Sequence, residues 1–174
     1  MFFVALYLAA IVAANLSVAT FGLGASYINA FLFIGLDLVT RDKLHNAWQN
    51  SGLVWKMGLL IASGSLLSYA LNSAAGGIAL ASCLAFGGAA LADAFVFSKL
   101  RGSWFVKSNG SNVAGALVDS LIFPTIAFGG LNLEITALQF AAKSAGGLFW
   151  SLIFGRFVAK YKSRESNPVQ VVSP

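Results

Sequence analysis

Six apolar runs, each about as long as a membrane-spanning helix, constrain the fold of this sequence more than any other feature. The runs fall at about 2–21, 27–44, 54–72, 77–98, 112–131 and 136–158, with short links between them. A helix needs roughly 20 apolar residues to cross the hydrocarbon core of a bilayer. Because lipid cannot satisfy backbone polar groups, runs of this length are expected to be helical. The sequence therefore predicts an all-α integral membrane bundle of six transmembrane helices.

Composition excludes a soluble globular domain. Of the 174 residues, 58% are hydrophobic and only 10% are charged, and the mean hydropathy is +0.80, far from the usual composition of soluble proteins. We expect a single transmembrane domain over 1–160. The segment 161–174 is polar and interrupted by proline, which predicts a disordered cytoplasmic tail.

Two of the runs carry unusual features. The first lacks the positively charged leading region of a signal peptide, so we expect a retained span. The second follows Gly22 and Gly24 and holds Asp37 and Arg41 in its last turns, so it is the run that we would expect to be short or re-entrant.

The positions of Lys and Arg predict the orientation, because cytoplasmic links keep these residues and external links do not. Ten of the eleven cations lie at the second link, the fourth link or the C-terminal end: Arg41, Lys43, Lys56, Lys99, Arg101, Lys107, Arg156, Lys160, Lys162 and Arg164. The other links contain neither residue. We therefore predict that both termini are cytoplasmic, and this distribution also argues against a nucleic-acid partner, which the net charge of +5 could suggest.

Asp93, Asp119 and Lys143 are ionisable groups within apolar runs. A charge at the bilayer centre costs about 2.5–3.5 kcal/mol even on lenient insertion scales, so such residues usually face a bundle interior or a wet cavity. Asp37 and Arg41 are four residues apart, a spacing that favours an intrahelical ion pair. One carboxylate of the remaining two is then left for a substrate, a proton or another partner.

Several polar residues are expected on the same faces as these charges. Asn112 precedes Asp119 by two turns, while Gln139 precedes and Trp150 follows Lys143. Asn15, in the middle of the first run, could bond across helices or contact a ligand. A site with carboxylate, amine, amide and aromatic groups suits a flat polar heterocycle better than a lipid or a simple ion.

Three further features have structural alternatives. Gly146 and Gly147 lie on the Lys143 face, where they could serve helix packing or leave room for a ligand. Pro124 is expected to kink the fifth helix beyond Asp119. His45 and Asp42, in a predicted link, have no second His or Cys nearby, so we expect no metal site there, and we expect no cofactor.

Four segments match a known family. FLFIGLDLVTRDKL (31–44), LADAFVFSKLR (91–101), NVAGALVDSLIFPTIAFG (112–129) and the Lys143 region resemble the queuosine-precursor transporter family, also described as putative vitamin-uptake transporters. The family's D-x-x-x-R motif falls on Asp37 and Arg41, and its other motifs fall on the Asp93 and Asp119 segments. Its Asn in the first helix corresponds to Asn15 and its lone Lys in the last helix to Lys143.

The resemblance implies a six-helix carrier, not an enzyme, that imports 7-deazaguanine precursors of queuosine, such as 7-cyano-7-deazaguanine, across the cytoplasmic (inner) membrane. The expected partners are this base and membrane lipid. The chain has no phosphate-binding loop, so either a proton on Asp93 or Asp119 drives transport or a separate ATPase module does.

Two other functions compete with import. An intramembrane aspartyl protease also uses two membrane carboxylates, which share a proton, but the chain lacks the Gly-x-Gly-Asp motif of those enzymes. A small structural or pore-forming membrane protein would not need Asp93, Asp119 and Lys143, so alanine at these positions would leave its function intact.

The charge distribution generates a topological prediction. A tag inserted at Ser163 should be accessible only from the cytoplasm, and a tag at Asn132 only from outside, because the positive-inside rule retains the cation-rich links. Labelling of intact and permeabilised cells with an impermeant reagent measures both. An external C-terminus would contradict the assignment.

Overall fold

The computed structural model describes residues 2–165, and the side-chain environments of residues 2–155. Its elements are α1 (Phe2–Phe21), α2 (Leu23–Asn29), the π-helical η1 (Ala30–Ile34), α3 (Gly35–Trp48), α4 (Leu53–Leu71), the 3-10 turn η2 (Ser73–Ala75), α5 (Gly76–Lys99), α6 (Trp104–Ala127) and α7 (Leu133–Glu165). No strand occurs in the described range. The predicted all-α fold is confirmed.

Four helical stretches have the length and apolar composition of membrane spans: Phe2–Phe21, Leu23–Trp48, Leu53–Leu71 and Ser73–Lys99. α6 and α7 have 24 and 33 residues, and at 1.5 Å per residue even 24 residues extend about 36 Å, more than a hydrocarbon core. Their less apolar composition comes from residues such as Asn112, Asp119 and Lys143, which are buried in the bundle.

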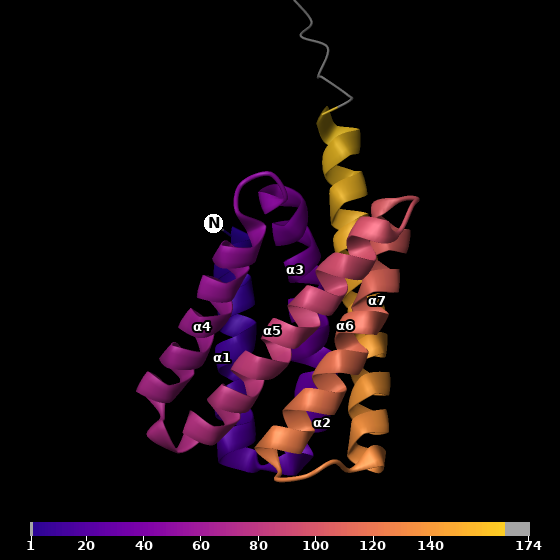
Figure 1. The fold of residues 1–174 in the computed structure, drawn as a ribbon. Coiled ribbons are helices and arrows are strands. Elements are labelled where there is room, and N and C mark those ends of the chain that lie inside the picture. The colour runs from indigo at the N-terminus through magenta and orange to yellow at the C-terminus, as the bar shows by residue number, and fades with distance from the viewer. Residues whose placement is uncertain (1, 166–174) are drawn as a thin grey trace, which may run out of the picture.

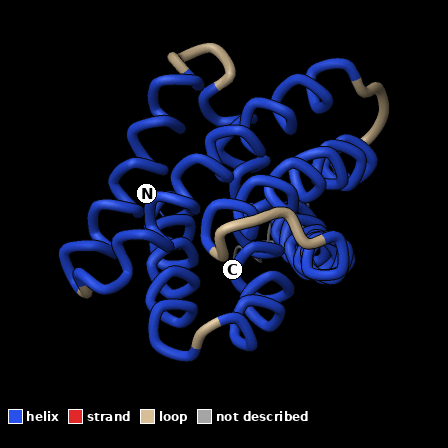
Figure 2. The backbone as a smooth tube through the Cα atoms, turned by 60° about the horizontal axis from the view of Figure 1, so that its bottom comes forward, coloured by secondary structure: helices blue, strands red, loops and turns tan. Residues whose placement is uncertain are grey.

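The helices run side by side with alternating direction. Figure 1 shows the N-terminus, the α3–α4 turn, the α5–α6 turn and the end of α7 at one end of the bundle, and the other turns at the opposite end. The loops, tan in Figure 2, are short. Lys43, Lys56, Lys99, Arg101 and Lys107 lie near the turns of the first end. The cations thus gather at one end in space as well, whereas the side of the membrane that this end faces stays a prediction.

The second run is not short or re-entrant in the structure. It forms a continuous 26-residue stretch from Leu23 to Trp48 that passes through the π-helical segment η1. Gly22, at a φ of 72°, makes the turn that separates it from α1, a backbone conformation that glycine adopts without strain. Asp37 therefore lies near the middle of a full-length span.

The boundaries of the last two helices also differ from the predicted ones. α6 begins at Trp104 instead of residue 112 and ends at Ala127, because Ser103 caps it and because Ser108 and Ser111 are buried in the bundle. α7 begins at Leu133, where Asn132 Oδ1 accepts the N–H groups of Glu134 and Ile135. α7 continues to Glu165, beyond the predicted start of the tail at 161. The rest of the predicted tail, 166–174, lies outside the described residues.

The core divides into an apolar and a polar part. The apolar part packs α1, α3, α4 and α5 together through a cluster that includes Tyr7, Ile11, Met57, Ile61 and Phe86. The buried charges lie between α3 and helices α5, α6 and α7. Large apolar side chains such as Leu66 and Phe95 are 67% and 66% exposed. This arrangement, with an apolar exterior around a partly polar interior, fits a protein surrounded by lipid.

Two glycines allow α7 to cross the second stretch at close range. A Cβ atom on Gly35 would lie 2.5 Å from the carbonyl carbon of Gly146, and one on Gly146 would overlap the carbonyl oxygen of Phe31. Of the two roles considered for Gly146, the structure shows helix packing. Gly147 is less crowded, since its Cβ would lie 3.6 Å from Leu38 Cδ1.

This crossing generates a stability prediction. Gly146→Ala should lower the free energy of unfolding by about 1–3 kcal/mol or more, because two backbones would have to separate. Gly87→Ala is the matched control, since nothing lies within 4 Å of a Cβ there and alanine favours a helix by about 1 kcal/mol. Thermal unfolding of both purified variants measures the difference. Equal stability of the two variants would contradict the close crossing.

Candidate functional site

A cavity is enclosed by helices from both halves of the chain. Its polar lining consists of Asn15, Ser26, Asn29, Ser82, Asp119, Gln139 and Lys143, and the rings of Phe86 and Phe123 form part of its wall. We call it the central cavity. Its volume is about 20 Å³, which is room for about one water molecule. The structure is therefore a closed form of this site.

An ion pair forms one side of the central cavity. Lys143 Nζ lies 2.6 Å from Asp119 Oδ2, and the two side chains are 1% and 2% exposed. Lys143 and Gln139 are one turn apart on α7, so Nζ also donates a hydrogen bond to Gln139 Oε1 at 2.7 Å. The second oxygen of Asp119, Oδ1, has no hydrogen-bond partner. The pair is thus charge-compensated but keeps a free acceptor.

Amide groups on the other side are fixed by bonds between helices. Asn15 Nδ2 donates to Ser68 Oγ at 3.1 Å, and Asn15 Oδ1 accepts from Ser82 Oγ. Asn29 Nδ2 donates to the carbonyl oxygen of Ala14 at 3.1 Å. Asn15 therefore bonds across helices, joining α1, α4 and α5, and it also lines the cavity.

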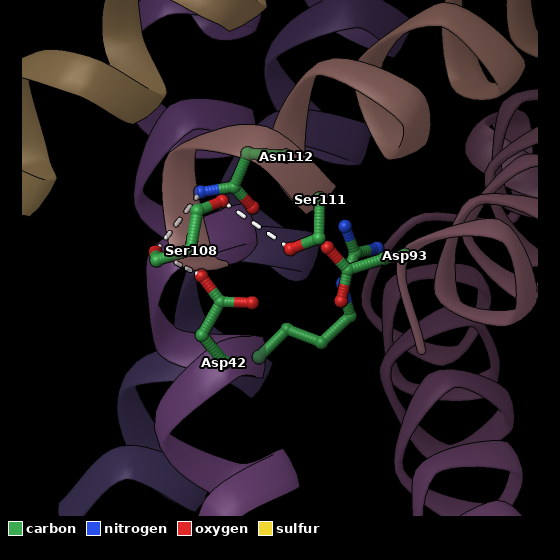
Figure 3. Close-up of polar contacts among 6 residues, drawn as sticks. Asp42, Asp93, Ser108, Ser111 and Asn112 are labelled. Carbon is green, nitrogen blue, oxygen red and sulfur yellow. Dashed lines mark hydrogen bonds and ion pairs between the residues drawn. The ribbon is translucent and has the colours of Figure 1, made fainter. Parts of the chain in front are cut away.

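A second group of buried charges lies toward the end of the bundle that carries the cations. Arg41 Nε is 3.5 Å from Asp93 Oδ2, and both side chains are at most 2% exposed. Figure 3 shows Asp42, Ser108 and Asn112 pointing toward one another. Ser108 Oγ donates to Asp42 Oδ2, and Asn112 Nδ2 donates to Ser108 Oγ at 3.4 Å. We call Asp37, Arg41, Asp42 and Asp93 the charged cluster.

The predicted ion pair between Asp37 and Arg41 is not the pair in the structure. The spacing of four residues places both groups on one face of α3, but the guanidinium Nε is closest to Asp93 of α5. Both carboxylate oxygens of Asp37 are buried, and neither has a hydrogen-bond partner of good geometry in the described chain. An intrahelical spacing does not exclude a better-placed partner on another helix.

The residues predicted to bind substrate separate into three places. Asn15, Asp119, Gln139 and Lys143 meet in the central cavity. Asp93 and Asn112 lie in and beside the charged cluster instead. Trp150 Nε1 donates to the carbonyl oxygen of Leu32 at 2.9 Å, so its indole packs on η1 and is absent from the cavity lining.

Sequence reasoning missed several residues of these two sites. Ser26, Asn29 and Ser82 line the central cavity, and Asp42 and Ser108 are fully buried although both were placed in links. Tyr7, also fully buried, could have been found, because Tyr7, Ile11 and Asn15 follow one helical face at intervals of four. Asp42 and Ser108 could not have been found in this way, because their neighbours in the sequence are polar and show no buried helical face.

A second, larger cavity reaches the charged cluster from between α3, α4 and α5. Its volume is about 230 Å³, and Arg41, His45 and Asp93 are the polar residues in an otherwise apolar lining. Within the described residues, no group of three or more His, Cys, Asp or Glu side chains could hold a metal ion.

The observed pairing generates a prediction for Arg41. Arg41→Ala should lower the free energy of unfolding by about 3–5 kcal/mol, because it leaves Asp93 as a buried charge without its cation. Adding Asp93→Ala should recover most of this loss, whereas adding Asp37→Ala should recover little. Unfolding of the single and double variants, read as a double-mutant cycle, measures the coupling. Recovery by Asp37→Ala, with little recovery by Asp93→Ala, would instead show that Arg41 pairs with Asp37.

The comparisons with known proteins agree with the membrane architecture. The family model described as "Putative vitamin uptake transporter" matches residues 3–161. No curated protein and no solved structure matched the chain. The match covers every element from α1 through most of α7, including both charged sites. The chain is a multi-pass membrane protein, and it belongs to the putative vitamin uptake transporter family.

Proposed function

We propose that this transporter-family chain imports a 7-deazaguanine precursor of queuosine, such as 7-cyano-7-deazaguanine, across the cytoplasmic membrane. The observation that carries the proposal is the central cavity, which Asp119, Lys143 and three amide side chains line together with Phe86 and Phe123. The family match supports uptake of a small organic molecule. The substrate itself is inferred from the chemistry of the cavity and from the motif resemblance.

The lining offers a complementary group for each part of a flat, polar base. Asp119 Oδ1, which has no partner in the closed form, can accept hydrogen bonds from the amino and ring N–H edge, and a carboxylate acceptor strengthens such bonds. Lys143 can donate to the ring carbonyl. The two phenylalanine rings provide apolar surfaces against which a heterocycle can pack.

In the closed form, hydrogen bonds already hold two of the amide side chains of the central cavity in place. Asn15 and Asn29 are held by Ser68, Ser82 and Ala14, so their orientation does not have to be established during binding. A bicyclic base is larger than a cavity of about 20 Å³, so the helices around the cavity have to separate for it to enter. Carriers commonly hold substrate near the membrane midplane and alternate access around it.

The competing protease function lacks its required geometry. Aspartyl proteases use two carboxylates that share one proton. Here Asp93 pairs with Arg41 and Asp119 pairs with Lys143, so each carboxylate has its own cation. A structural or pore-forming protein would in turn have no use for the fixed amides of the central cavity.

Uptake tests the proposed substrate directly. Cells that cannot synthesise queuosine precursors, and that express this chain, should accumulate labelled 7-cyano-7-deazaguanine and restore queuosine in their tRNA. Cells with an empty vector are the control. Equal uptake by both would overturn the assignment of substrate, and alanine variants of Asp93, Asp119 and Lys143 with unchanged uptake would favour a structural protein.

Asp119→Asn should weaken binding of the base by roughly 2–5 kcal/mol, because the amide presents a donor where the base presents donors and breaks a buried charged contact. Binding to the purified protein in detergent measures the loss. Glu134→Gln is the matched control, because it makes the same chemical change at an exposed position at the start of α7.

The amount of folded Asp119→Asn protein has to be measured alongside, because Lys143 loses its carboxylate. Gln139→Leu provides a second test, since Lys143 keeps Asp119 while the cavity loses an amide. If both variants fold and bind the base as tightly as the parent, the central cavity is not its binding site.

A further inference from the structure

The charges buried in the bundle do not balance. Among the side chains that the structure describes, four carboxylates are at most 2% exposed: Asp37, Asp42, Asp93 and Asp119. Only two Lys or Arg side chains, Arg41 and Lys143, are comparably buried. Each cation is already paired, Arg41 with Asp93 and Lys143 with Asp119. Two carboxylates, Asp37 and Asp42, are left without a cation of their own.

Asp42 and Asp37 differ in how they are accommodated. Asp42 accepts a hydrogen bond from Ser108, which in turn accepts one from Asn112. Asp37 is fully buried, and neither of its oxygens makes a hydrogen bond of good geometry, although the Tyr7 hydroxyl lies close to the carboxyl group. A buried carboxylate without a partner avoids its charge by taking up a proton. Asp37, which has neither a cation of its own nor a serine donor like that of Asp42, is therefore a group that a proton would neutralise inside the bundle.

Ionisable groups from α1, α3, α5 and α6 surround Asp37. The nearby ionisable groups are Tyr7 of α1, Arg41 of the same helix, Asp93 of α5 and Asp119 of α6, the last of which is compensated by Lys143 of α7. The hydroxyl of Tyr7 is buried beside Asp37, although the two groups make no hydrogen bond of good geometry.

Arg41 can serve either of two carboxylates. It lies one turn beyond Asp37 on the same face of α3, the arrangement of an intrahelical pair, although its Nε is paired with Asp93. Its Nη1 and Nη2 atoms have no hydrogen-bond partner. Gly115 of α6 lets the guanidinium pack closely against that helix, since a Cβ atom there would lie 2.7 Å from Nη2.

A cavity toward the cation-bearing end of the bundle reaches Arg41 of this pair. The second cavity, of about 230 Å³, is lined by Arg41, His45 and Asp93. It is large enough for several water molecules. Water that enters it reaches Asp93 and Arg41, one turn of α3 away from Asp37.

We propose that Asp37 is the proton-binding site that couples substrate transport to a proton gradient, with Arg41 exchanging between Asp93 and Asp37. In the form described here, Asp37 carries the proton and Arg41 pairs with Asp93. When the O–H bond of Asp37 breaks, its proton passes through water to Asp93, where a new O–H bond forms. The guanidinium, protonated throughout, then moves to the Asp37 carboxylate. One proton has moved toward the cation-bearing end, and the net charge of the cluster is unchanged.

Infrared spectroscopy of the purified protein tests the proton on Asp37 without any substrate. The parent should show the C=O stretching band of a buried protonated carboxyl group, and Asp37→Asn should lose that component. Asp42→Asn, a matched change five residues later on α3, should keep it. A parental band that persists in full in Asp37→Asn, or that disappears only in Asp42→Asn, would overturn the proposal.

Stability provides a second readout of the same state. Because asparagine resembles a neutral aspartic acid, Asp37→Asn should unfold at the same temperature as the parent. Asp93→Asn removes the partner of Arg41 and should unfold at a lower temperature. A loss in Asp37→Asn as large as that in Asp93→Asn would mean that Asp37 is ionised, which contradicts the proposal.

The coupling role rests on the proposed function and is tested with labelled 7-cyano-7-deazaguanine in proteoliposomes. The parent should concentrate the base when an inward proton gradient is imposed and lose this ability with a protonophore. Asp37→Asn should still exchange labelled for unlabelled base but should no longer concentrate it. Concentration by Asp37→Asn at the parental level would overturn the coupling role. If the parent moves no base at all, the proposed substrate is wrong, whereas the infrared result on Asp37 still stands.

Discussion

The charges of α3 impose the constraint on which the rest of the bundle depends. Asp37, Arg41 and Asp42 follow one another within six residues and are all at most 2% exposed. In hydrocarbon such groups are tolerated only if other helices cover and pair them. α5 supplies Asp93, and α6 supplies Ser108 and the side-chain-free surface at Gly115 against which the Arg41 guanidinium packs. On the α7 side, the close backbone crossing at Gly35 and Gly146 completes the enclosure. The polar residues that α5 and α6 direct inward are thus explained by the buried charges of α3.

This constraint also accounts for the composition of the last two helices. α6 and α7 are not among the four stretches that are apolar enough to be identified as spans by composition. Their polar side chains are needed inside, where Asp119, Gln139 and Lys143 form a connected group. A helix packed against partners on several sides can carry such residues, because each finds a partner in the bundle interior. Composition alone therefore underestimates the number of long helices in a bundle with a polar centre.

Features that depend on a local sequence pattern could be predicted. Contacts between residues that are distant in the chain could not. Apolar run length gave the six long helical stretches, and isolated charges in those runs identified Asp119 and Lys143, which the structure places together. The ion pair that the structure shows for Arg41 is with Asp93, which lies 52 positions away in the chain, whereas helical spacing shows only the intrahelical candidate Asp37. Asp42 and Ser108 were assigned to links because their neighbours are polar, yet they bond to each other inside the bundle. Trp150 was assigned to the site from the face that it shares with Lys143, but its indole reaches Leu32 instead.

The central cavity and the charged cluster differ in their balance of acidic and basic side chains. We interpret this difference as a division between substrate binding and energy coupling. The central cavity holds one carboxylate and one ammonium group in direct contact. A neutral heterocycle can therefore exchange hydrogen bonds there without changing the charge of the bundle. Movement of a neutral molecule is not driven by a membrane potential, so concentrating it requires a coupled ion or another energy source. Among the described residues, the uncompensated carboxylates lie on α3 outside the cavity lining. Substrate and proton can thus occupy separate groups, linked through α3, whose Asp37 lies near Asp119 and whose Arg41 contacts Asp93.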